Sequence, residues 1–320
     1  MPENLDVICI GAALVDMVAK VERHPLEDDE VFVSDLTLLS GGAAANTAYA
    51  CAKLGLDTAF IGKLGPHDEF GGKIIIDFQE VSLDTSLIKY SDIYGTGSAY
   101  VALNLEGDRR IYAHSGAANF LSKEDIVPDE IKRARVIFLS SLKNIDPFIE
   151  AAKIARKQEI TVILNPGMLI IDLGLDHIKK LLEKIEILIL SQREYTTLLS
   201  IKNPELDEKF IFKSSNALIK LGINVLVVTM GNKGAFITNG KDSALIPPSE
   251  VEEVIDTTGA GDAFSAGFIY KFVQQLSNDF ENLRVAVEYG NLIAGKCIQK
   301  LGARNGMLTE EELNSLFKEK

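Results

Sequence analysis

DTTGAGDAFSAGF, the stretch Asp256–Phe268, is the most informative part of the sequence. Two glycines and an alanine stand just before an apolar segment that predicts a helix over Phe264–Leu276. Small residues allow backbone amides to converge on an anion, and the helix dipole favours negative charge at a helix start. The stretch therefore predicts an anion-binding helix N-terminus near the end of the chain.

Asp262 lies in the first turn of this helix, beside the expected anion. A carboxylate next to a phosphate site is electrostatically unfavourable unless it has a chemical role. Accepting a proton from a hydroxyl that attacks the phosphorus is the role that fits. The alternative is that Asp262 only caps the helix, because Asp is common at helix starts.

Two further polar residues stand out near the N-terminus. Asn46 ends the small-residue stretch Ser40–Asn46 (SGGAAAN) and begins a helix predicted over Asn46–Leu54, which Gly55 ends. Its amide suits a ligand hydroxyl because it offers a donor and an acceptor, and the alternative is a helix N-cap. Asp16 interrupts the apolar run ALVDMVA, so it needs a partner: a polyhydroxylated ligand, a cap interaction or a salt bridge.

Short apolar runs alternate with helix-like segments along the rest of the chain. The runs are nearly continuous in β-branched residues and leucine, which is typical of strands buried on both faces of a parallel sheet. The predicted strands are Val7–Gly11, Thr58–Ile61, Val136–Leu139, Ile160–Leu164, Ile187–Leu190 and Val225–Thr229. The predicted helices include Glu69–Val81, Asp146–Lys157, segments ending near Lys184 and at Gly222, one near Glu194, Leu283–Ile298 and Glu310–Lys318. This alternation predicts an α/β fold with helices on both sides of the sheet.

Two segments depart from this pattern. Val31–Leu39 and Gly97–Ala113 contain polar–apolar alternation, and the second holds a turn at Glu106–Asp108. Alternation is typical of antiparallel strands with one face in water. We expect a small sheet that protrudes from the main domain and closes over a ligand.

Composition excludes several classes of function. Lys and Arg number 33 against 46 Asp and Glu, a net charge of −13, which argues against nucleic acid as a partner. Three dispersed cysteines and four scattered histidines form neither a disulfide framework nor a metal-ligand spacing. No apolar stretch is long enough to cross a membrane, and the N-terminal sequence lacks a basic signal region, so we expect a cytoplasmic protein.

Two nucleotide-binding motifs are also excluded. No GxGxxG follows the first predicted strand, so a dinucleotide fold lacks support. Gly290–Lys296 has the glycine and lysine spacing of a P-loop, but Cys297 replaces the Ser or Thr that binds magnesium. The segment is also predicted as helix, so we treat the match as coincidence.

Together the motifs resemble the ribokinase family, also called the PfkB carbohydrate and nucleoside kinases. GGAAANTAYACAKLG (Gly41–Gly55) and DTTGAGDAFSAGF are similar to the two hallmark motifs of the family, in the same order. Further similar stretches are KLGPHDEFG (Lys63–Gly71), HSGAAN (His114–Asn119), LNPG (Leu164–Gly167) and VVTMGNKGA (Val227–Ala235). The resemblance covers essentially the whole chain. It implies an α/β three-layer sandwich with a mainly parallel central sheet and a small antiparallel β lid.

The resemblance also implies an activity and site residues. The activity is transfer of the γ-phosphoryl group of ATP to a primary hydroxyl of a sugar-like substrate. Asp262 matches the catalytic base, and Gly259, Ala260 and Gly261 match the anion hole. The expected substrate-binding residues are Asp16, Gly41, Gly42, Asn46, Asn119 and Arg109. The expected nucleotide-binding residues are Thr229, Gly231, Gly234, Asn291 and Glu194.

Metal ions enter through the same resemblance. Asp256 and Thr258 match part of a monovalent-cation site, so potassium dependence is a hypothesis. Mg²⁺ would arrive mainly on the nucleotide, with Glu194 acting through water. The family commonly has Asn-x-x-Glu after a central strand, and here Ser191 takes the Asn position. This departure puts the metal organisation in doubt but leaves Asp262 and the anion hole intact.

The resemblance further suggests a domain division and an assembly. It implies a large domain of residues 1–12, 40–94 and 117–320, and a lid of residues 13–39 and 95–116. In many members the lid sheet pairs with that of a second subunit, so a homodimer through the lid is expected.

The substrate is left open by the sequence. A sugar is the leading interpretation, and a nucleoside is the alternative, with Phe32, Tyr100 or Tyr112 as stacking residues. Arg109 and Arg110 would suit an acidic or phosphorylated sugar, unless they belong to a solvated turn. A non-catalytic sugar-binding regulator on the same scaffold is the third interpretation.

Overall fold

An eight-stranded sheet forms the centre of the computed structural model, which describes residues 4–202 and 206–318. The strand order is β14-β13-β12-β11-β10-β9-β1-β4. Neighbours from β12 to β4 run parallel, and β13 and β14 add an antiparallel edge. The strands are β1 (Leu5–Gly11), β4 (Thr58–Ile61), β9 (Ala134–Ser140), β10 (Thr161–Asn165), β11 (Ile187–Ser191), β12 (Val225–Thr229), β13 (Ala235–Thr238) and β14 (Ser243–Ile246).

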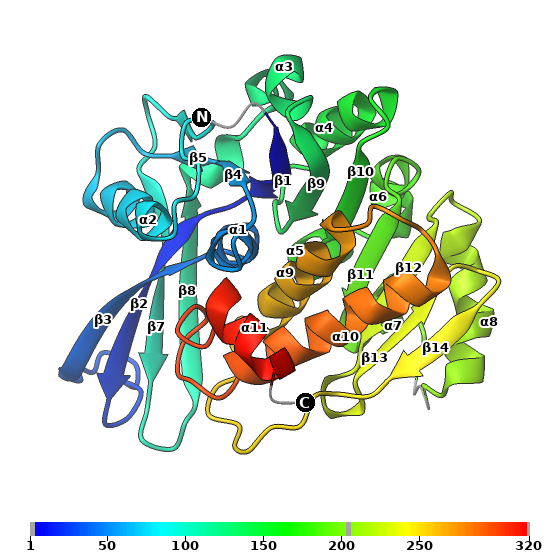
Figure 1. Cartoon of the computed structure of the whole chain (residues 1–320). Helices are drawn as coiled ribbons and strands as arrows, with labels where there is room; N and C mark the ends of the chain where they lie inside the picture. The colour runs from blue at the N-terminus through cyan, green and yellow to red at the C-terminus, as the bar shows by residue number, and fades with distance from the viewer. Residues whose placement is uncertain (1–3, 203–205, 319–320) are drawn as a thin grey trace.

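Helices cover both faces of this sheet and give three layers (Figure 1). One face packs against α1 (Ala43–Lys53), α2 (Glu69–Glu80), α9 (Ala260–Val273), α10 (Phe280–Cys297) and α11 (Glu310–Lys318). The other face packs against α3 (Pro128–Ile131), α4 (Asp146–Lys157), α5 (Gly167–Ile171), α6 (Leu175–Leu182), α7 (Gln192–Leu198) and α8 (Glu208–Ile219). This arrangement confirms the predicted three-layer α/β sandwich. None of the helices in the described part of the chain combines the length and apolarity that a membrane span needs.

The continuous apolar strands explain the two cores. In β1, Val7 and Cys9 point into one core, whereas Ile8 and Ile10 point into the other. A strand covered on both faces has no solvated side, so polar alternation is absent. The predicted runs are therefore strands, as expected. The hairpin of β13 and β14 was not predicted, since its four-residue strands lie close to ordinary turn sequences.

A second sheet projects from one end of the main sheet and forms the lid (Figure 1). Its order is β3-β2-β7-β8, with β2 (Leu14–Val21), β3 (Val33–Gly41), β7 (Thr96–Leu103) and β8 (Arg109–Gly116). The expectation of an antiparallel lid is wrong at its centre, because β2 and β7 run parallel. The chain passes through the main domain between these two strands, so no hairpin constrains them. The pairs β2–β3 and β7–β8 are antiparallel, as expected.

Strand β2 is absent from the sequence-based prediction. Its buried residues Val15, Ala19 and Val21 alternate with Asp16 and Lys20, a period-2 pattern that identifies a half-buried strand. The remaining two-stranded sheet joins β5 (Lys63–Leu64) and β6 (Lys89–Tyr90).

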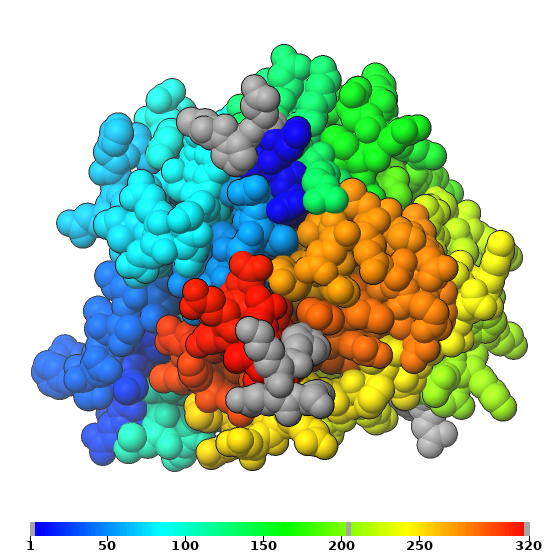
Figure 2. Space-filling model, viewed as in Figure 1, coloured from blue at the N-terminus to red at the C-terminus, as the bar shows by residue number. Residues whose placement is uncertain are grey.

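The topology brings the conspicuous sequence motifs to one region. Gly11, Ser140 and Asn165 end three neighbouring strands in one register row, at the carboxyl edge where parallel α/β sheets bind ligands. Figure 2 shows the C-terminal segment, in red, between the blue lid side and helices α9 and α10 in orange. The division into a large domain and a lid with the stated boundaries stays a prediction. Of its residues, 1–3, 203–205 and 319–320 lie outside the described ones.

Candidate active site

The start of α9 forms an open helix N-terminus. Gly259 is its N-cap residue in the left-handed region, with φ of 81°, and helix α9 begins at Ala260. The amides of Gly261 and Asp262 precede Ala263, whose amide is the first to donate within the helix, to the Gly259 carbonyl, so they stay available to a ligand. A side-chain carbon built on Gly261 would have no neighbour within 4 Å, so the space in front of the helix is open. This geometry suits an anion.

The Asp262 carboxylate faces α1 rather than its own helix start. Its Oδ2 accepts a hydrogen bond of 2.9 Å from Asn46 Nδ2, and the N-cap of α9 has no side-chain cap bond. The helix-cap interpretation of Asp262 is therefore wrong. The residue is half-buried, and dense packing around its carboxyl group raises its pKa to about 7, with Glu194 adding to the shift. The Asn46 hydrogen bond and the Arg304 charge act in the opposite direction.

Asn46 lies inside α1 and not at its cap. Gly42, with φ of 97°, is the N-cap residue, so Asn46 falls one turn into the helix, where it is buried. A side chain on Gly42 would meet the Ala12 carbonyl oxygen at 2.4 Å. The N-cap interpretation of Asn46 is wrong, and its amide is free to bridge other elements. Its Oδ1 accepts a hydrogen bond of 2.9 Å from Arg304 Nε.

Asp16 reaches the same region from lid strand β2. It is half-buried, and this burial raises its pKa, while the charge of Arg304 lowers it. A side-chain carbon on Gly41 would lie 2.5 Å from Asp16 Oδ2, so only glycine leaves room for this carboxylate. Among the described residues no hydrogen bond or ion pair engages Asp16 directly. Its position favours a ligand as its partner over a helix cap or a salt bridge.

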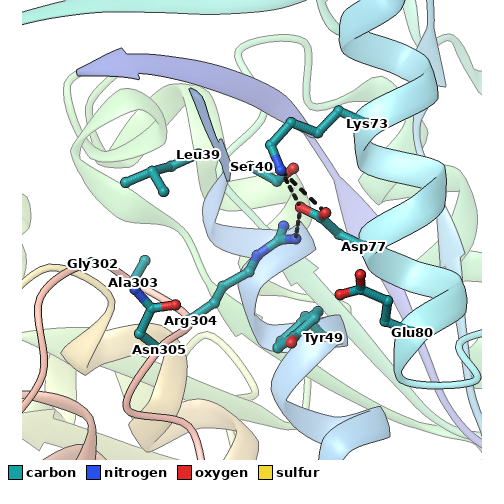
Figure 3. Close-up of a pocket in the computed structure, with 10 residues that line it drawn as sticks. All are labelled: Leu39, Ser40, Tyr49, Lys73, Asp77, Glu80, Gly302, Ala303, Arg304 and Asn305. Carbon is teal, nitrogen blue, oxygen red and sulfur yellow. Dashed lines mark hydrogen bonds and ion pairs between the residues drawn. The ribbon is translucent and has the colours of Figure 1, made fainter. Parts of the chain in front are cut away.

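A cavity of about 310 Å³ lies between the lid and the segments around α9. Lid residues Asp16, Val18, Thr37 and Val101 face the chain near Asp256 and residues 301–305 across it. A second cavity of about 180 Å³ adjoins it and shares Leu39, Ser40, Gly302, Ala303 and Asn305 with its lining (Figure 3). The two cavities therefore share a wall formed by the lid and the C-terminal loop, and the larger cavity has a mainly apolar lining.

Arg109 links the lid to the main domain. Its guanidinium lies 3.4 Å from Asp256 Oδ1 and 3.3 Å from Thr258 Oγ1, and its side chain is 47% exposed. The solvated-turn interpretation is therefore wrong for Arg109, while Arg110 is exposed. The pKa of Asp256 is lowered by its hydrogen bonds from Thr258, Gly302 and Arg109, which outweigh its burial.

The donors around Asp256 bear on the potassium hypothesis. Oδ1 accepts from the Thr258 amide at 3.0 Å and the Thr258 hydroxyl at 2.7 Å, besides Arg109. Oδ2 accepts from the Gly302 amide at 2.9 Å. A carboxylate with these partners already has a neighbouring cation. The residues present therefore fit a monovalent cation poorly.

The residues expected at the nucleotide lie at the ends of β12 and along α10. Thr229 ends β12, and Gly231 and Gly234 bracket the short 3₁₀ turn Gly231–Lys233 with φ of 59° and 86°. A side chain on Gly234 would meet the Ile246 carbonyl oxygen at 2.0 Å. Asn291 is buried on α10, and its amide donates to the carbonyls of Ile246 and Pro247. Asn291 thus holds the chain after β14, and any nucleotide role would use its remaining oxygen.

Ser191 and Glu194 form a capping box at the start of α7. Ser191 Oγ accepts from the Glu194 amide at 3.3 Å, and Glu194 accepts from the Ser191 amide at 2.6 Å. Serine and asparagine are both good N-cap residues, so the serine in place of asparagine keeps this helix start. Glu194 is 8% exposed and lies close enough to Asp262 to raise the pKa of that residue. No group of three His, Cys, Asp or Glu in the described ranges could hold a metal ion.

Three residues change the predicted set. Asn119 is exposed on the 3₁₀ turn Ala117–Phe120, and within the described part of the chain no hydrogen bond joins it to Asp262, Asn46 or Arg304. Asn165, at the end of β10, donates to Ser265 Oγ at 3.2 Å and so supports α9. Arg304 was missed because a single arginine after a helix carries no local signal.

The assembled geometry can support one kind of chemistry. A carboxylate with a pKa near neutrality lies in the first turn of a helix whose start has free amides, and Thr258, just before that start, lines the larger cavity. The carboxylate can accept a proton, and the amides can stabilise negative charge. These are the requirements of phosphoryl transfer to a hydroxyl.

Comparison with known proteins agrees with this chemistry. A family profile described as "pfkB family carbohydrate kinase" matches residues 4–310. The chain is 31% identical over 313 residues to a ribokinase of Staphylococcus aureus, covering 97% of this chain and 99% of the relative. It is 27% identical over 312 residues to a deoxyribokinase of Salmonella typhi, covering 97% and 98%.

A solved structure matches at the level of the fold. The ribokinase of Arabidopsis thaliana, complexed with ribose and ATP, superposes with a TM-score of 0.87 and is 26% identical. The match covers 98% of this chain and 99% of that protein. Both the lid and the main sheet are thus shared with a sugar-bound kinase structure.

Proposed function

From the premise that this chain belongs to the pfkB family of carbohydrate kinases and phosphorylates a sugar, we propose that its acceptor is a neutral pentose. The γ-phosphoryl group of ATP passes to the primary hydroxyl of that sugar. The observation that carries the proposal is the Asp262 carboxylate, which lies in the first turn of α9 and is held by Asn46, while Asp256 and Thr258 just before that helix line the lid cavity of about 310 Å³. The similar ribokinase and deoxyribokinase support a pentose.

Asp262 acts as the general base in this proposal. The acceptor hydroxyl gives its proton to the Asp262 carboxylate as its oxygen forms a bond to the γ-phosphorus. The bond from that phosphorus to the bridging β–γ oxygen breaks, and ADP leaves with the electron pair. A base with a pKa of about 7 is well matched to neutral pH.

The start of α9 stabilises the charge on the transferred group. The proposed anion hole is formed at Gly259, Ala260 and Gly261, where the Gly261 amide is free and the Ala260 amide also donates to the Thr257 carbonyl at 3.2 Å. The helix dipole adds to their effect. These groups are fixed before the reaction begins, so they need no reorganisation as charge develops.

The remaining polar residues hold the two substrates. In the proposal, Asp16, Gly41, Gly42 and Asn46 bind the hydroxyls of the sugar. Of these residues Asp16 lines the cavity, as does Arg109 of the lid. Asn119 remains a weaker candidate because it is exposed. Thr229, Gly231, Gly234 and Asn291 are the proposed nucleotide residues. Mg²⁺ would be carried by the ATP phosphates, and Glu194 would orient its water ligands.

Potassium has no role in the proposed mechanism. Arg109 already supplies a positive charge to Asp256, and Thr258 and Gly302 occupy further lone pairs of that carboxylate.

A nucleoside or a phosphorylated sugar is the less favoured substrate. No aromatic side chain of the described residues lines the larger cavity, whereas base recognition commonly uses stacking. Phe32 and Tyr112 are 85% and 68% exposed. Arg109 is paired with Asp256, so a substrate phosphate has no free partner in it. Coupled ADP release with ribose, 2-deoxyribose, fructose, adenosine and 2-keto-3-deoxygluconate tests this; best turnover with adenosine or the sugar acid would contradict it.

The Arg109 contact predicts a small effect on sugar affinity. Arg109→Ala is expected to raise the sugar KM by no more than about fivefold, because the Arg109 side chain of the pair is 47% exposed and an ion pair with a solvated partner contributes roughly 0.2–1 kcal/mol. Steady-state kinetics on the preferred sugar provide the measurement, with Arg110→Ala as the matched control. A rise of about a hundredfold would instead assign Arg109 to an anionic group of the substrate.

The lid also supplies the proposed dimer interface. Apolar side chains on the lid face turned away from the cavity are exposed, namely Leu36, Leu38 and Tyr112. Exposed apolar patches on this scale commonly mark interaction surfaces. We expect light scattering to give the mass of a dimer and Leu36→Asp to give a monomer. A wild-type monomer at micromolar concentration would refute this interface.

A further inference from the structure

Arg304 is a buried cation that the proposed mechanism has not used. It follows α10, and its side chain is only 9% exposed. The guanidinium lies above the rings of Tyr49 and Phe78, at 4.9 Å and 5.5 Å from their centroids. Figure 3 shows it extending from the C-terminal loop toward Asp77 of α2, and its Nη1 lies 3.7 Å from Asp77 Oδ2.

The hydrogen bonds of Arg304 are unevenly distributed. Nε donates to Asn46 Oδ1 at 2.9 Å, while Nη1 and Nη2 are buried without a hydrogen-bond partner beside the 180 Å³ cavity. Burying a guanidinium with unsatisfied donors is costly. An apolar side chain would pack on Tyr49 and Phe78 without that cost. The retained charge therefore points to a role beyond stability.

The role follows from the two ends of the Asn46 amide. Because Arg304 can only donate, it selects the oxygen of the amide and leaves Nδ2 facing Asp262. Without Arg304 the amide can turn over and present its oxygen to the carboxylate. An oxygen repels the ionised carboxylate and accepts from the protonated one. Arg304 thus favours the orientation that binds the ionised base.

We propose that Arg304 is a positioning residue for phosphoryl transfer, which aims the Asp262 carboxylate and keeps it ionised by fixing the Asn46 amide. The chain of contacts runs from Asp77 through Arg304 and Asn46 to Asp262, and joins α2, the C-terminal loop, α1 and α9. The inference rests on the proposed role of Asp262 as the base.

The charges around Asp262 agree with this role. Arg304 and the Asn46 hydrogen bond lower the pKa of Asp262, whereas burial and Glu194 of α7 raise it. Cys297 of α10 also faces Asp262, and its own pKa is raised to about 11, so it stays neutral near pH 7. Asp16 on β2 is also attracted by the positive charge of Arg304, which lowers the pKa of Asp16 against the effect of burial. Burial lowers the pKa of Arg304 only to about 10, so it stays protonated at neutral pH.

The test is the pH dependence of kcat in three variants at Arg304. Arg304→Met removes both the charge and the donor, so we expect kcat at pH 7 to fall about tenfold or more and the acid-limb midpoint to rise by about one pH unit. Arg304→Gln keeps a donor for Asn46 without the charge, so its plateau kcat recovers while its midpoint stays raised. Arg304→Lys keeps the charge, so its midpoint returns toward that of the wild type.

Controls separate this role from a structural one. Glu80 lines the same cavity but is not part of the contact chain from Asp77 to Asp262. Glu80→Gln should therefore leave the pH profile of kcat unchanged. Should Arg304→Met fail to fold, Arg304→Gln and Arg304→Lys still differ in midpoint. A wild-type midpoint in folded Arg304→Gln would overturn the inference. If the wild type itself lacks kinase activity, the proposed function fails instead. The pH titration of the ¹⁵N-labelled Asn46 amide signal then tests Arg304 without turnover.

Discussion

Asp262→Asn lowers kcat by at least about 10²-fold, with the sugar KM changed by only a few-fold; this is the largest effect that we expect. General-base catalysis contributes about 10²–10⁴-fold, and asparagine cannot accept the hydroxyl proton. The side chains have the same shape, so the Asn46 contact at 2.9 Å and the anion hole stay in place. Steady-state ADP release at saturating ATP and sugar measures the loss.

The same substitution has a predicted effect on stability. The pKa of Asp262 is about 7 in the folded protein against 3.8 for an ordinary Asp, so the folded state binds this proton more tightly. Its contribution to the free energy of unfolding is fully present below pH 4 and is lost as the pH rises to about 7. Above that pH, Asp262→Asn should be more stable than the wild type in urea denaturation. Glu281→Gln, at an exposed position, serves as the matched control for stability.

For activity, an Asp262→Asn variant whose kcat lies within a few-fold of that of the wild type would exclude Asp262 as the base.

Gly259→Ala is the second large effect. Its φ of 81° is left-handed, and a Cβ there would lie 2.6 Å from the Ala303 carbonyl oxygen. The left-handed conformation costs about 1–2 kcal/mol for an L-residue, and overpacking adds about 1–3 kcal/mol. The strain is relieved by shifting the start of α9, and loss of one such donor costs about 10²–10³-fold in kcat. We therefore expect both lower stability and a large loss of activity.

Two other glycines make this prediction specific. A Cβ on Gly261 or on Gly72 has no neighbour within 4 Å. Gly72 is an exposed position of α2 that contacts none of the site residues, so Gly72→Ala should keep full activity and gain up to about 1 kcal/mol in stability. Gly261→Ala should keep its stability but lose activity, because its methyl group enters the space in front of the helix. Equal behaviour of all three variants would contradict the assigned anion hole.

Much of this arrangement could be predicted from the sequence because it is encoded locally. The strands of the central sheet are continuous apolar runs, and the anion site is a run of small residues at one helix start. The lid strands β3 and β7–β8 were indicated by alternation. The pairing of β2 with β7 was not predictable, since it depends on how the intervening main domain folds.

The site contacts were harder to predict because they join distant residues. The sequence predicts Asn46 as either a helix cap or a ligand-binding residue. In the structure Gly42 is the N-cap of α1, in a backbone conformation that only glycine adopts easily, so the helix begins before Asn46. Arg304 contacts Asn46, which lies 258 residues earlier in the sequence, and also Asp77 of helix α2. No sequence motif marks Arg304. The partner of Arg109 is likewise fixed only by the closing of the lid onto Asp256.

Phosphorus NMR of the reaction product tests the central claim most directly. Wild-type protein is incubated with Mg-ATP and either ribose or 2-deoxyribose, with Asp262→Asn in parallel. The account predicts ADP and a sugar phosphomonoester whose phosphorus signal is a triplet, because two protons of a primary CH₂ couple to it, and no such signal with the variant. Inorganic phosphate as the only product, or a doublet from a secondary hydroxyl, would contradict it.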